Sequence, residues 1–357
     1  MSIRVGILDQ TPIYEGETPV EAFRHTIELA QRAEQLGFHR FWVSEHHDGQ
    51  HVAGSSPEVL ISHLLAHTKR IRLGSGGVML QHYSPYKVAE NFNVLAALGP
   101  GRIDLGIGRA PGGLPRSTQA LQQGTQEAAS LQEKIVQVRR YIHNEPFEDA
   151  SHPFAGLSAS PVSGNPAELY ILGASADSAG MAAELGLPYV FSLFINSSTE
   201  VALEAIRVYR ERFDRSRGQE PYAALAISLI AAESEQEAEQ LASEHQLVKI
   251  HLESGKVLTV GSVEQAEEFG RQSNESYRVE VLEPSVIRGT KEKVGQALLK
   301  LQQDFDIQEI IVTTAARDFS KRVRSFELLH ELLAAQGVPD FVQVSAHGAA
   351  KREAAIG

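Results

Sequence analysis

Short apolar runs alternate along the chain with segments whose apolar residues recur every three or four positions. Residues 3–8, IRVGIL, form one such run, and Phe23, Ile27 and Ala30 belong to an imperfect helical stripe at residues 19–37. A continuous apolar run is typical of a strand covered on both faces, and a 3.6-residue stripe is typical of a helix packed on one side. The runs predict eight strands, at residues 3–8, 38–43, 71–80, 101–108, 168–173, 188–194, 222–232 and 309–314.

The helical stripes fall between these strands. They predict helices at residues 19–37, 57–68, 84–98, 125–143, 174–186, 198–217, 234–250, 290–304 and 319–336. Strand and helix in regular alternation predict a parallel α/β fold, and eight units fit a (β/α)8 TIM barrel with insertions after strands 4 and 7. The alternative is an open doubly wound sheet, but the first strand–helix turn carries no G-x-G-x-x-G sequence.

The same pattern predicts one domain over residues 1–340 with two long excursions. Residues 145–167 contain four prolines and little periodicity, which indicates a loop excursion. Residues 233–308 are too long for one crossover helix, and the stretch 261–277 within them is polar, so we expect an insertion that serves as a mobile lid. Residues 341–357 are expected to be a C-terminal tail.

Composition narrows the class of function. The net charge is −12, from 45 acidic and 33 basic residues, which argues against nucleic acid as a partner. The chain contains no cysteine, so disulfides, thiolate metal sites and cysteine nucleophiles are excluded. No apolar run is long enough for a membrane span and no signal peptide is evident, so we expect a cytoplasmic protein.

Ionisable residues follow the second predicted strand, where the apolar run FWV gives way to Ser44, Glu45, His46 and His47. In a barrel the carboxyl ends of the strands carry the catalytic groups. A metal site is disfavoured, because adjacent histidines in an extended segment point in opposite directions and no later strand ends in histidine. A solvated turn and an imidazole held in a pocket by Glu45 as orienting or acid–base partner remain alternatives.

Two further strand ends suggest a ligand. The segment after the fifth strand, Gly173-Ala174-Ser175, opens a helix whose unpaired N–H groups could bind an anion or could simply be capped by Ser175. Arg109 stands alone after the fourth strand, as a possible phosphate partner or an ordinary surface charge. Gly76-Gly77 within the third strand indicates either a β-bulge or a flat ligand against bare backbone.

Together these segments resemble the bacterial luciferase-like flavin monooxygenase family. The resemblance rests on GFHRFWVSEHH, on LGSGGVMLQHYSPYKVAENFNVLAALGPGRIDLGIGRAPGG, on LGASADSAGMAAELGLPYVF and on RGTKEKV, over roughly residues 3–335. Family members bind FMN non-covalently in a (β/α)8 barrel. Gly108 stands where luciferase carries a reactive cysteine, so the resemblance does not imply light emission.

The resemblance also implies roles for individual residues. It makes His46 the catalytic histidine and Glu45 its acidic neighbour. It places a non-prolyl cis peptide at Gly76-Gly77, under the flavin ring. The phosphate-binding positions that it implies are Arg109, Gly173, Ala174, Ser175 and Ser178.

The expected function is therefore an FMN-dependent monooxygenase of a two-component system, in which a separate flavin reductase supplies reduced FMN and the oxygenase acts on a small organic substrate with O2. Three alternatives stay open: a deazaflavin-dependent dehydrogenase on the same barrel, a non-catalytic flavin-binding or partner subunit, and a metallohydrolase barrel. The resemblance further implies a homodimer formed through the second and third helices.

Overall fold

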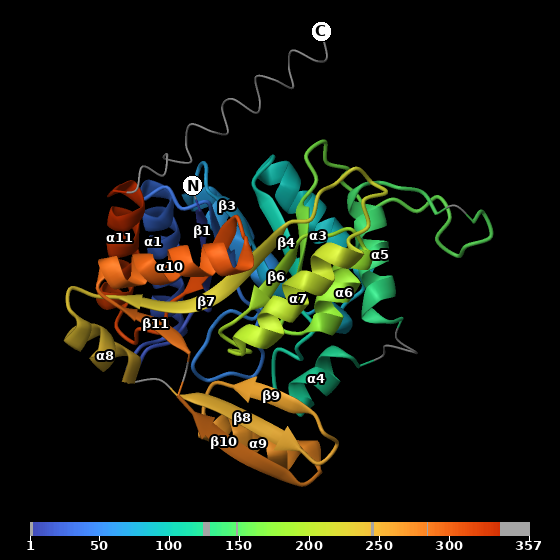
Figure 1. Cartoon of the computed structure of the whole chain (residues 1–357). Coiled ribbons are helices and arrows are strands. Elements are labelled where there is room, and N and C mark those ends of the chain that lie inside the picture. The colour runs from blue at the N-terminus through green and yellow to red at the C-terminus, as the bar shows by residue number, and fades with distance from the viewer. Residues whose placement is uncertain (1–2, 124–128, 148, 244–245, 284, 336–357) are drawn as a thin grey trace.

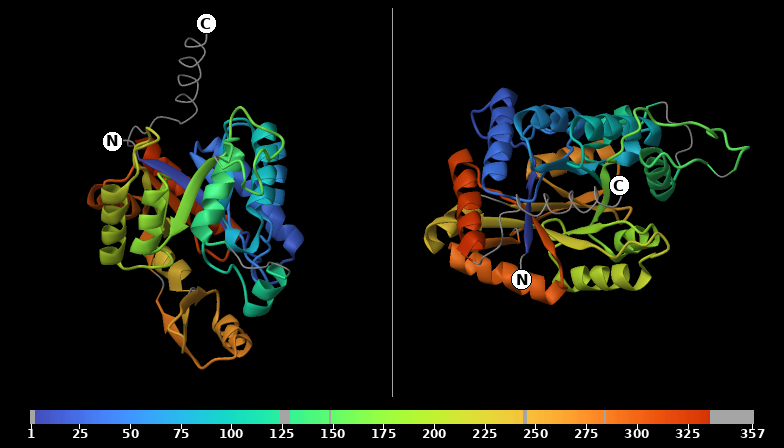
Figure 2. Two further views of the ribbon diagram at one scale, coloured as in Figure 1. Left: turned by 90° about the vertical axis from the view of Figure 1, so that its right-hand side faces the viewer. Right: turned by 90° about the horizontal axis from the view of Figure 1, so that it is seen from above.

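A computed structural model of the chain shows a closed barrel of parallel strands surrounded by helices (Figures 1 and 2). It describes residues 3–123, 129–147, 149–243, 246–283 and 285–335. The predicted start of a helix at 125–128 and the predicted tail at 341–357 lie outside these residues. The barrel strands are β1 (Arg4–Asp9), β2 (Arg40–Val43), β3 (Arg72–Val78), β4 (Ile103–Ile107), β5 (Glu168–Gly173), β6 (Tyr189–Ser192), β7 (Ala223–Ala231) and β12 (Glu309–Thr313).

Parallel pairing runs around the barrel in chain order, and the β6–β7 pairing closes it. All eight predicted strands are present, and the fold is the predicted (β/α)8 barrel rather than an open doubly wound sheet. A ninth strand, β11 (Val286–Gly289), extends the sheet by pairing in parallel with the carboxyl-terminal half of β7.

Helices on the outside of the barrel follow the predicted positions, most with slightly shorter bounds and the helix predicted at 290–304 shifted by one residue. They are α1 (Pro19–Gln35), α2 (Pro57–His67), α3 (Pro85–Leu98), α5 (Leu131–Ile142), α6 (Ala176–Glu184), α7 (Thr199–Arg212), α10 (Lys291–Phe305) and α11 (Phe319–Ala335). Local sequence explains several starts: α1, α2 and α3 each have proline in the first turn, and Thr18, Ser84 and Ser198 cap their helices through side-chain oxygens.

A buried ionic group fills the barrel near the amino ends of the strands. The Arg40 guanidinium donates from Nη1 to Asp104 Oδ2 at 2.6 Å and from Nε to Glu309 Oε1 at 2.8 Å, and it lies 4.7 Å from the centre of the Tyr170 ring. Burial would raise the pKa of Asp104, but the charges of Arg40 and Arg72 outweigh burial and hold that pKa below its usual value. The barrel interior is therefore packed and charged at this end, which leaves the opposite rim for a ligand.

The second excursion differs from its predicted secondary structure. The predicted helix 234–250 ends early, as α8 (Glu235–Ser243), and the polar stretch 261–277 contains a helix, α9 (Val263–Ser273). The strands β8 (Leu247–Leu252), β9 (Val257–Val260) and β10 (Tyr277–Leu282) form an antiparallel sheet of their own. This small sheet was missed because β8 and β10 alternate apolar and polar residues over only six positions each, between charged segments.

The small sheet and α9 lie beyond the carboxyl ends of the barrel strands, at the bottom of Figure 1. Leu114, from the segment after β4, packs into their apolar cluster with Val248, Ile250 and Phe269. Leu114 also precedes a short helix that the sequence did not predict, α4 (Pro115–Leu121), whose first N–H, from Arg116, donates to Gln272 of α9. The insertion is thus packed against the β4 end of the rim, and its service as a mobile lid stays a prediction.

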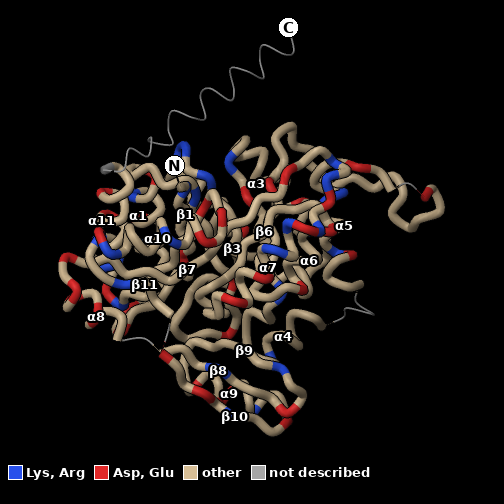
Figure 3. The backbone as a smooth tube through the Cα atoms, in the orientation of Figure 1, with Lys and Arg blue, Asp and Glu red and all other residues tan. Residues whose placement is uncertain are grey.

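The first excursion, at 145–167, projects from the side of α5 as the green loop in Figure 1. Acidic and basic residues are interspersed in the view of Figure 3, and no continuous basic face appears there. Among the described residues, no helix is long and apolar enough to cross a membrane.

Candidate functional site

The barrel brings the predicted site residues together on four neighbouring strand ends. β2 pairs with β3, β3 with β4, and β4 with β5. Adjacent strands lie about 4.8 Å apart. The residues Glu45 and His46 after β2, Gly76 and Gly77 in β3, Arg109 after β4 and the segment 173–178 after β5 therefore follow one arc of the carboxyl rim.

Gly76 and Gly77 lie where β3 departs from regular pairing. The register with β4 shifts between Gly76 and Val78, as in a β-bulge, and the Gly76–Gly77 peptide bond is cis. A Cβ on Gly76 would lie 2.6 Å from Leu8 Cδ1, and a Cβ on Gly77 would lie 2.6 Å from the carbonyl oxygen of Gly106. Barrel packing alone therefore requires glycine at position 77, where the Cβ would meet backbone, whereas at position 76 the Leu8 side chain would have to move. The bulge and the implied cis peptide are confirmed, whereas a flat ligand against this backbone remains a prediction.

Glu45 is a fully buried carboxylate with three donors. Its Oε1 accepts from Tyr83 Oη at 2.7 Å and from His47 Nε2 at 2.7 Å, and its Oε2 accepts from the Met79 N–H at 3.0 Å. Burial and then the charge of Glu45 raise the pKa of Tyr83, so the phenol keeps its proton. Of the two adjacent histidines, the imidazole that Glu45 holds is therefore His47.

His46 is held by different groups. Its main-chain N–H donates to the Gly54 carbonyl at 2.8 Å, and its Nδ1 lies 3.0 Å from Ser44 Oγ. Burial and then the neighbouring His47 lower the pKa of His46 to about 4, with Glu45 opposing them. The imidazole is therefore neutral near pH 7. Because the Ser44 hydroxyl can donate to or accept from Nδ1, His46 can carry a proton on Nε2 or accept one there.

The helix terminus and the cation of the predicted anion site occupy adjacent strand ends. Arg109 is exposed, and among the described residues its guanidinium makes no hydrogen bond or ion pair. Ser175 is the N-cap of α6, and its Oγ accepts from the Ser178 N–H at 3.3 Å, so the capping that the sequence allowed is present. The first-turn N–H groups before Ser178 lack helical partners. The Ser178 hydroxyl is less available, because it is buried and donates to the Ser175 carbonyl at 2.8 Å, with Tyr189 Oη 2.9 Å away.

Gly173 and Ala174 shape this corner through the backbone. A Cβ on Gly173 would overlap the side chain of Ser178, so glycine is required where the chain leaves β5. The Ala174 carbonyl accepts from Asn196 Nδ2 at 3.0 Å, which fixes the turn into α6. The corner can therefore receive an anion with its N–H groups already oriented.

Sequence reasoning placed His47 at the rim without choosing it over His46 as the partner of Glu45, and it missed Gln81, His82 and Tyr83. The last three directly follow the predicted third strand, in the sequence LQHYSP. The rule that polar residues after a barrel strand face the rim would have selected them.

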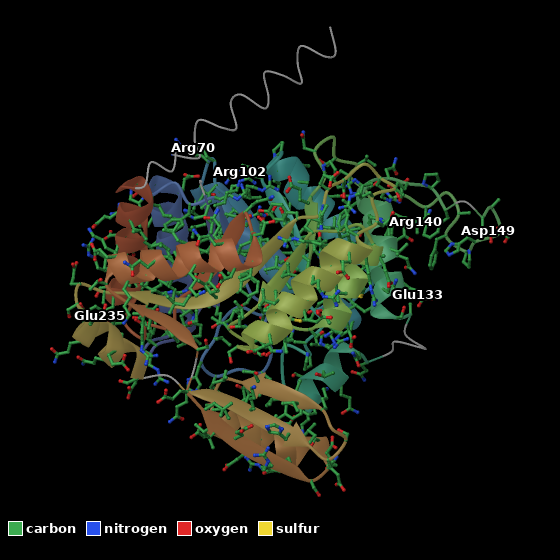
Figure 4. The ribbon with its side chains drawn as sticks, viewed as in Figure 1. Arg70, Arg102, Glu133, Arg140, Asp149 and Glu235 are labelled. Carbon is green, nitrogen blue, oxygen red and sulfur yellow. The ribbon has the colours of Figure 1, made fainter. Side chains whose placement is uncertain are left out.

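Among the described residues, no group of three or more histidine, cysteine, aspartate or glutamate side chains could hold a metal ion. A hollow of about 770 Å³ lies elsewhere, along α5, with Glu133, Arg140, Phe147 and His152 among its lining residues. Figure 4 labels Glu133 and Arg140 on this side of the molecule. None of its lining residues comes from a strand end, so it is separate from the candidate site.

Comparison with known proteins identifies the chain's relatives. A family model described as luciferase-like monooxygenase matches residues 3–306. The N-acetyl-S-alkylcysteine monooxygenase of Bacillus subtilis (strain 168) is 42% identical over 334 residues, which cover 93% of this chain and 99% of that protein. The crystal structure of apo-MsnO8 is 33% identical, covers 93% of this chain and 98% of its own, and superposes with a TM-score of 0.74.

Two solved structures with lower identity share the fold alone. The oxygenating constituent of 3,6-diketocamphane monooxygenase from Pseudomonas putida, in complex with FMN, is 19% identical, covers 94% of this chain and 98% of its own, and has a TM-score of 0.65. An F420-dependent secondary alcohol dehydrogenase is 16% identical, covers 93% and 99%, and has a TM-score of 0.64.

Proposed function

The chain belongs to the luciferase-like monooxygenase family of enzymes, and from this premise we propose that it is the oxygenase of a two-component system that uses reduced FMN and O2. One observation carries the choice of cofactor: the exposed guanidinium of Arg109 stands on the strand end next to the N-terminus of α6. A phosphate fits between an exposed cation and the first-turn N–H groups of α6 that the Ser175 side chain does not cap. The glycine backbone of β3, on the other side of β4, offers a surface for a planar ring.

In this proposal, each residue has a distinct task. Arg109, Ser175 and the first-turn N–H groups of α6 bind the phosphate, and Gly76 and Gly77 support the ring. Bound reduced FMN supplies the electrons with which O2 is activated. His46 exchanges a proton at Nε2 with the reacting groups, while the packed insertion helps to exclude water.

Glu45 has a positioning task in the same proposal. Its carboxylate bonds both to His47 and to the Met79 N–H, just beyond the glycines of β3. Glu45 therefore fixes the glycine backbone of β3, which would support the flavin ring, relative to the segment that carries His46 and His47. It does not transfer protons in this proposal.

Binding titrations test the cofactor. We expect the purified protein to bind FMN, and Arg109→Ala to weaken FMN binding by about tenfold or more, because a charge-assisted pair to phosphate is lost. Tight binding of a deazaflavin with no response to FMN would instead support the dehydrogenase alternative. Unchanged FMN affinity in Arg109→Ala would remove that residue from the phosphate site.

Turnover tests the histidine. With a flavin reductase, NADH and O2, we expect His46→Ala to lose at least about 100-fold in kcat, the typical contribution of a proton-transferring group, while FMN affinity changes little. If wild-type and variant turn over equally, His46 has no catalytic task.

S-alkylated N-acetylcysteines are the first substrates to assay, since a relative named for acting on N-acetyl-S-alkylcysteine is 42% identical over nearly the whole chain. No product from any of them, with reductase active, would move the search to other substrates.

A cytoplasmic location and a homodimer belong to the same proposal. The outer faces of α2 and α3 expose Val59 to 68%, Val94 to 44% and Leu98 to 62%, and a contact between two copies would bury these side chains. We expect sedimentation velocity to show a dimer that Leu98→Asp dissociates. A monomeric wild-type protein at micromolar concentration would contradict the dimer.

A further inference from the structure

The segment that follows β4 is held at four successive main-chain carbonyls. Gln81 Nε2 donates to the carbonyls of Arg109, at 3.3 Å, and Ala110, at 2.5 Å. His82 Nε2 donates to the Pro111 carbonyl at 2.8 Å, and the His47 main-chain N–H donates to the Gly112 carbonyl at 2.7 Å. Arg109 and Ala110 are exposed, and exposed loop carbonyls ordinarily bond to water, so the side-chain donor on these two carbonyls is an unusual restraint.

The donors come from the two neighbouring strand ends. Gln81 and His82 lie in the short 3-10 helix Leu80–His82 after β3, and His47 lies after β2. His82 is itself oriented, because Gln122 Nε2 lies 3.1 Å from its Nδ1. A neutral imidazole with its proton on Nε2 satisfies both contacts. Hydrogen bonds to these four carbonyls therefore connect the segment after β4, which begins at Arg109, to the ends of β2 and β3.

The side chain of Gln81 acts at the start of this segment. Both of its contacts use Nε2, and its Oε1 has no hydrogen-bond partner among the described residues. Its hydrogen bonds therefore serve to fix the main chain of residues 109 and 110. The Arg109 side chain is exposed and long, so the direction of its Cα–Cβ bond decides which part of the rim the guanidinium can reach.

We propose that Gln81 is a positioning residue for cofactor binding: it fixes the main chain at Arg109 so that the guanidinium meets the phosphate of the bound nucleotide. The inference rests on the proposed flavin function and adds a residue that none of the comparisons assigns. Because the main chain at Arg109 is already held before binding, less conformational entropy is lost when the nucleotide binds, and the binding affinity is higher. The effect of Gln81 must therefore depend on the phosphate and on Arg109.

The experiment is a flavin titration of the full-length protein with two ligands, FMN and riboflavin, which differ by the phosphate. Gln81→Met keeps the length of the side chain and removes the donor, and Gln81→Leu is a second variant of the same kind. We expect either to weaken FMN binding by about three- to tenfold, the range for one lost hydrogen bond, and to leave riboflavin binding unchanged. In the background of Arg109→Ala, Gln81→Met should cause no further loss.

Gln31→Met is the matched control. Gln31 Nε2 donates to the His67 carbonyl at 3.2 Å, on α1 and away from the rim. The Gln31→Met variant loses the same kind of side-chain-to-carbonyl hydrogen bond as Gln81→Met, and we expect its FMN affinity to equal that of the wild type. Circular dichroism confirms that each variant is folded before titration.

The remaining outcomes separate the two levels of the proposal. Wild-type FMN affinity in both Gln81 variants overturns the positioning task, as does an equal loss for FMN and riboflavin, which would indicate a general structural effect. A loss that adds fully to that of Arg109→Ala also overturns it, because the two residues would then act independently. If the wild-type protein binds no FMN, the proposed function itself fails, and the inference fails with it.

Discussion

The neutral imidazole of His46 predicts a specific dependence of stability on pH. Burial and the neighbouring His47 lower its pKa from 6.5 to about 4 in the folded protein. An unfolded chain has no such environment, so its histidine takes up a proton near pH 6.5. Between these two values the unfolded state binds more protons than the folded state, and stability must fall as the pH falls.

The magnitude follows from the difference between the two pKa values. At about 1.36 kcal/mol for each pH unit, the difference between 6.5 and about 4 corresponds to roughly 3 kcal/mol, reached in full only below pH 4. At pH 5 the loss on account of His46 is about 2 kcal/mol, and at pH 7.5 it is nearly zero. The window from pH 7.5 to pH 5 therefore contains most of the effect.

The assay is urea unfolding of the wild type and of His46→Gln at several pH values in this window. The free energy of unfolding of the wild type should decrease by about 2 kcal/mol more than that of the variant between pH 7.5 and pH 5. His63→Gln, at an exposed position of α2, is the control and should keep the wild-type slope. Equal slopes for wild type and His46→Gln would show that His46 is not held neutral in the folded protein, and the reasoning about its proton would fall with it.

Two further predictions concern the barrel itself. Gly77→Ala should destabilise the fold by about 1–3 kcal/mol in urea unfolding, since its Cβ would lie 2.6 Å from the Gly106 carbonyl oxygen. The control Gly164→Ala, whose Cβ meets no atom within 4 Å, should be neutral or stabilising by up to about 1 kcal/mol. Equal effects of the two substitutions would contradict the steric argument. Arg40→Leu should cost about 3–5 kcal/mol, because it leaves buried Glu309 without its guanidinium partner and buried Asp104 with Arg72 alone. Arg207→Leu, which breaks two exposed ion pairs on α7, with Glu204 and Glu211, should leave the urea midpoint nearly unchanged, and a comparable loss of stability in both variants would refute the role of burial.

The barrel was predictable from the sequence for a local reason. Each barrel strand is covered by helices on its outer face and packed on its inner face, so its apolar run stands out without any knowledge of its neighbours. The small sheet of the insertion has one face on α9 and strands of four to six residues, and its weak alternation was hidden by the charged residues around it.

The positions of the site residues were predictable because parallel strands deliver their carboxyl ends to one rim. Glu45, Gly76, Arg109 and Ser175 therefore lie along one arc, in the order of their strands. Hydrogen-bond partners were not predictable, because they depend on distances between side chains from different strands. Only the tertiary structure shows that Glu45 binds His47 and Tyr83 rather than His46, and that Gln81 reaches the carbonyls beside Arg109.

The sequence by itself thus determined the fold class and the strand ends that carry the predicted site residues, since both follow from periodicity along a single chain. The tertiary structure decided which polar groups are paired, which imidazole is kept neutral by burial, and which guanidinium stays exposed without a partner among the described residues. These properties depend on how closely separate strand ends approach and how much water they exclude, and neither quantity is encoded in the spacing of residues along the chain.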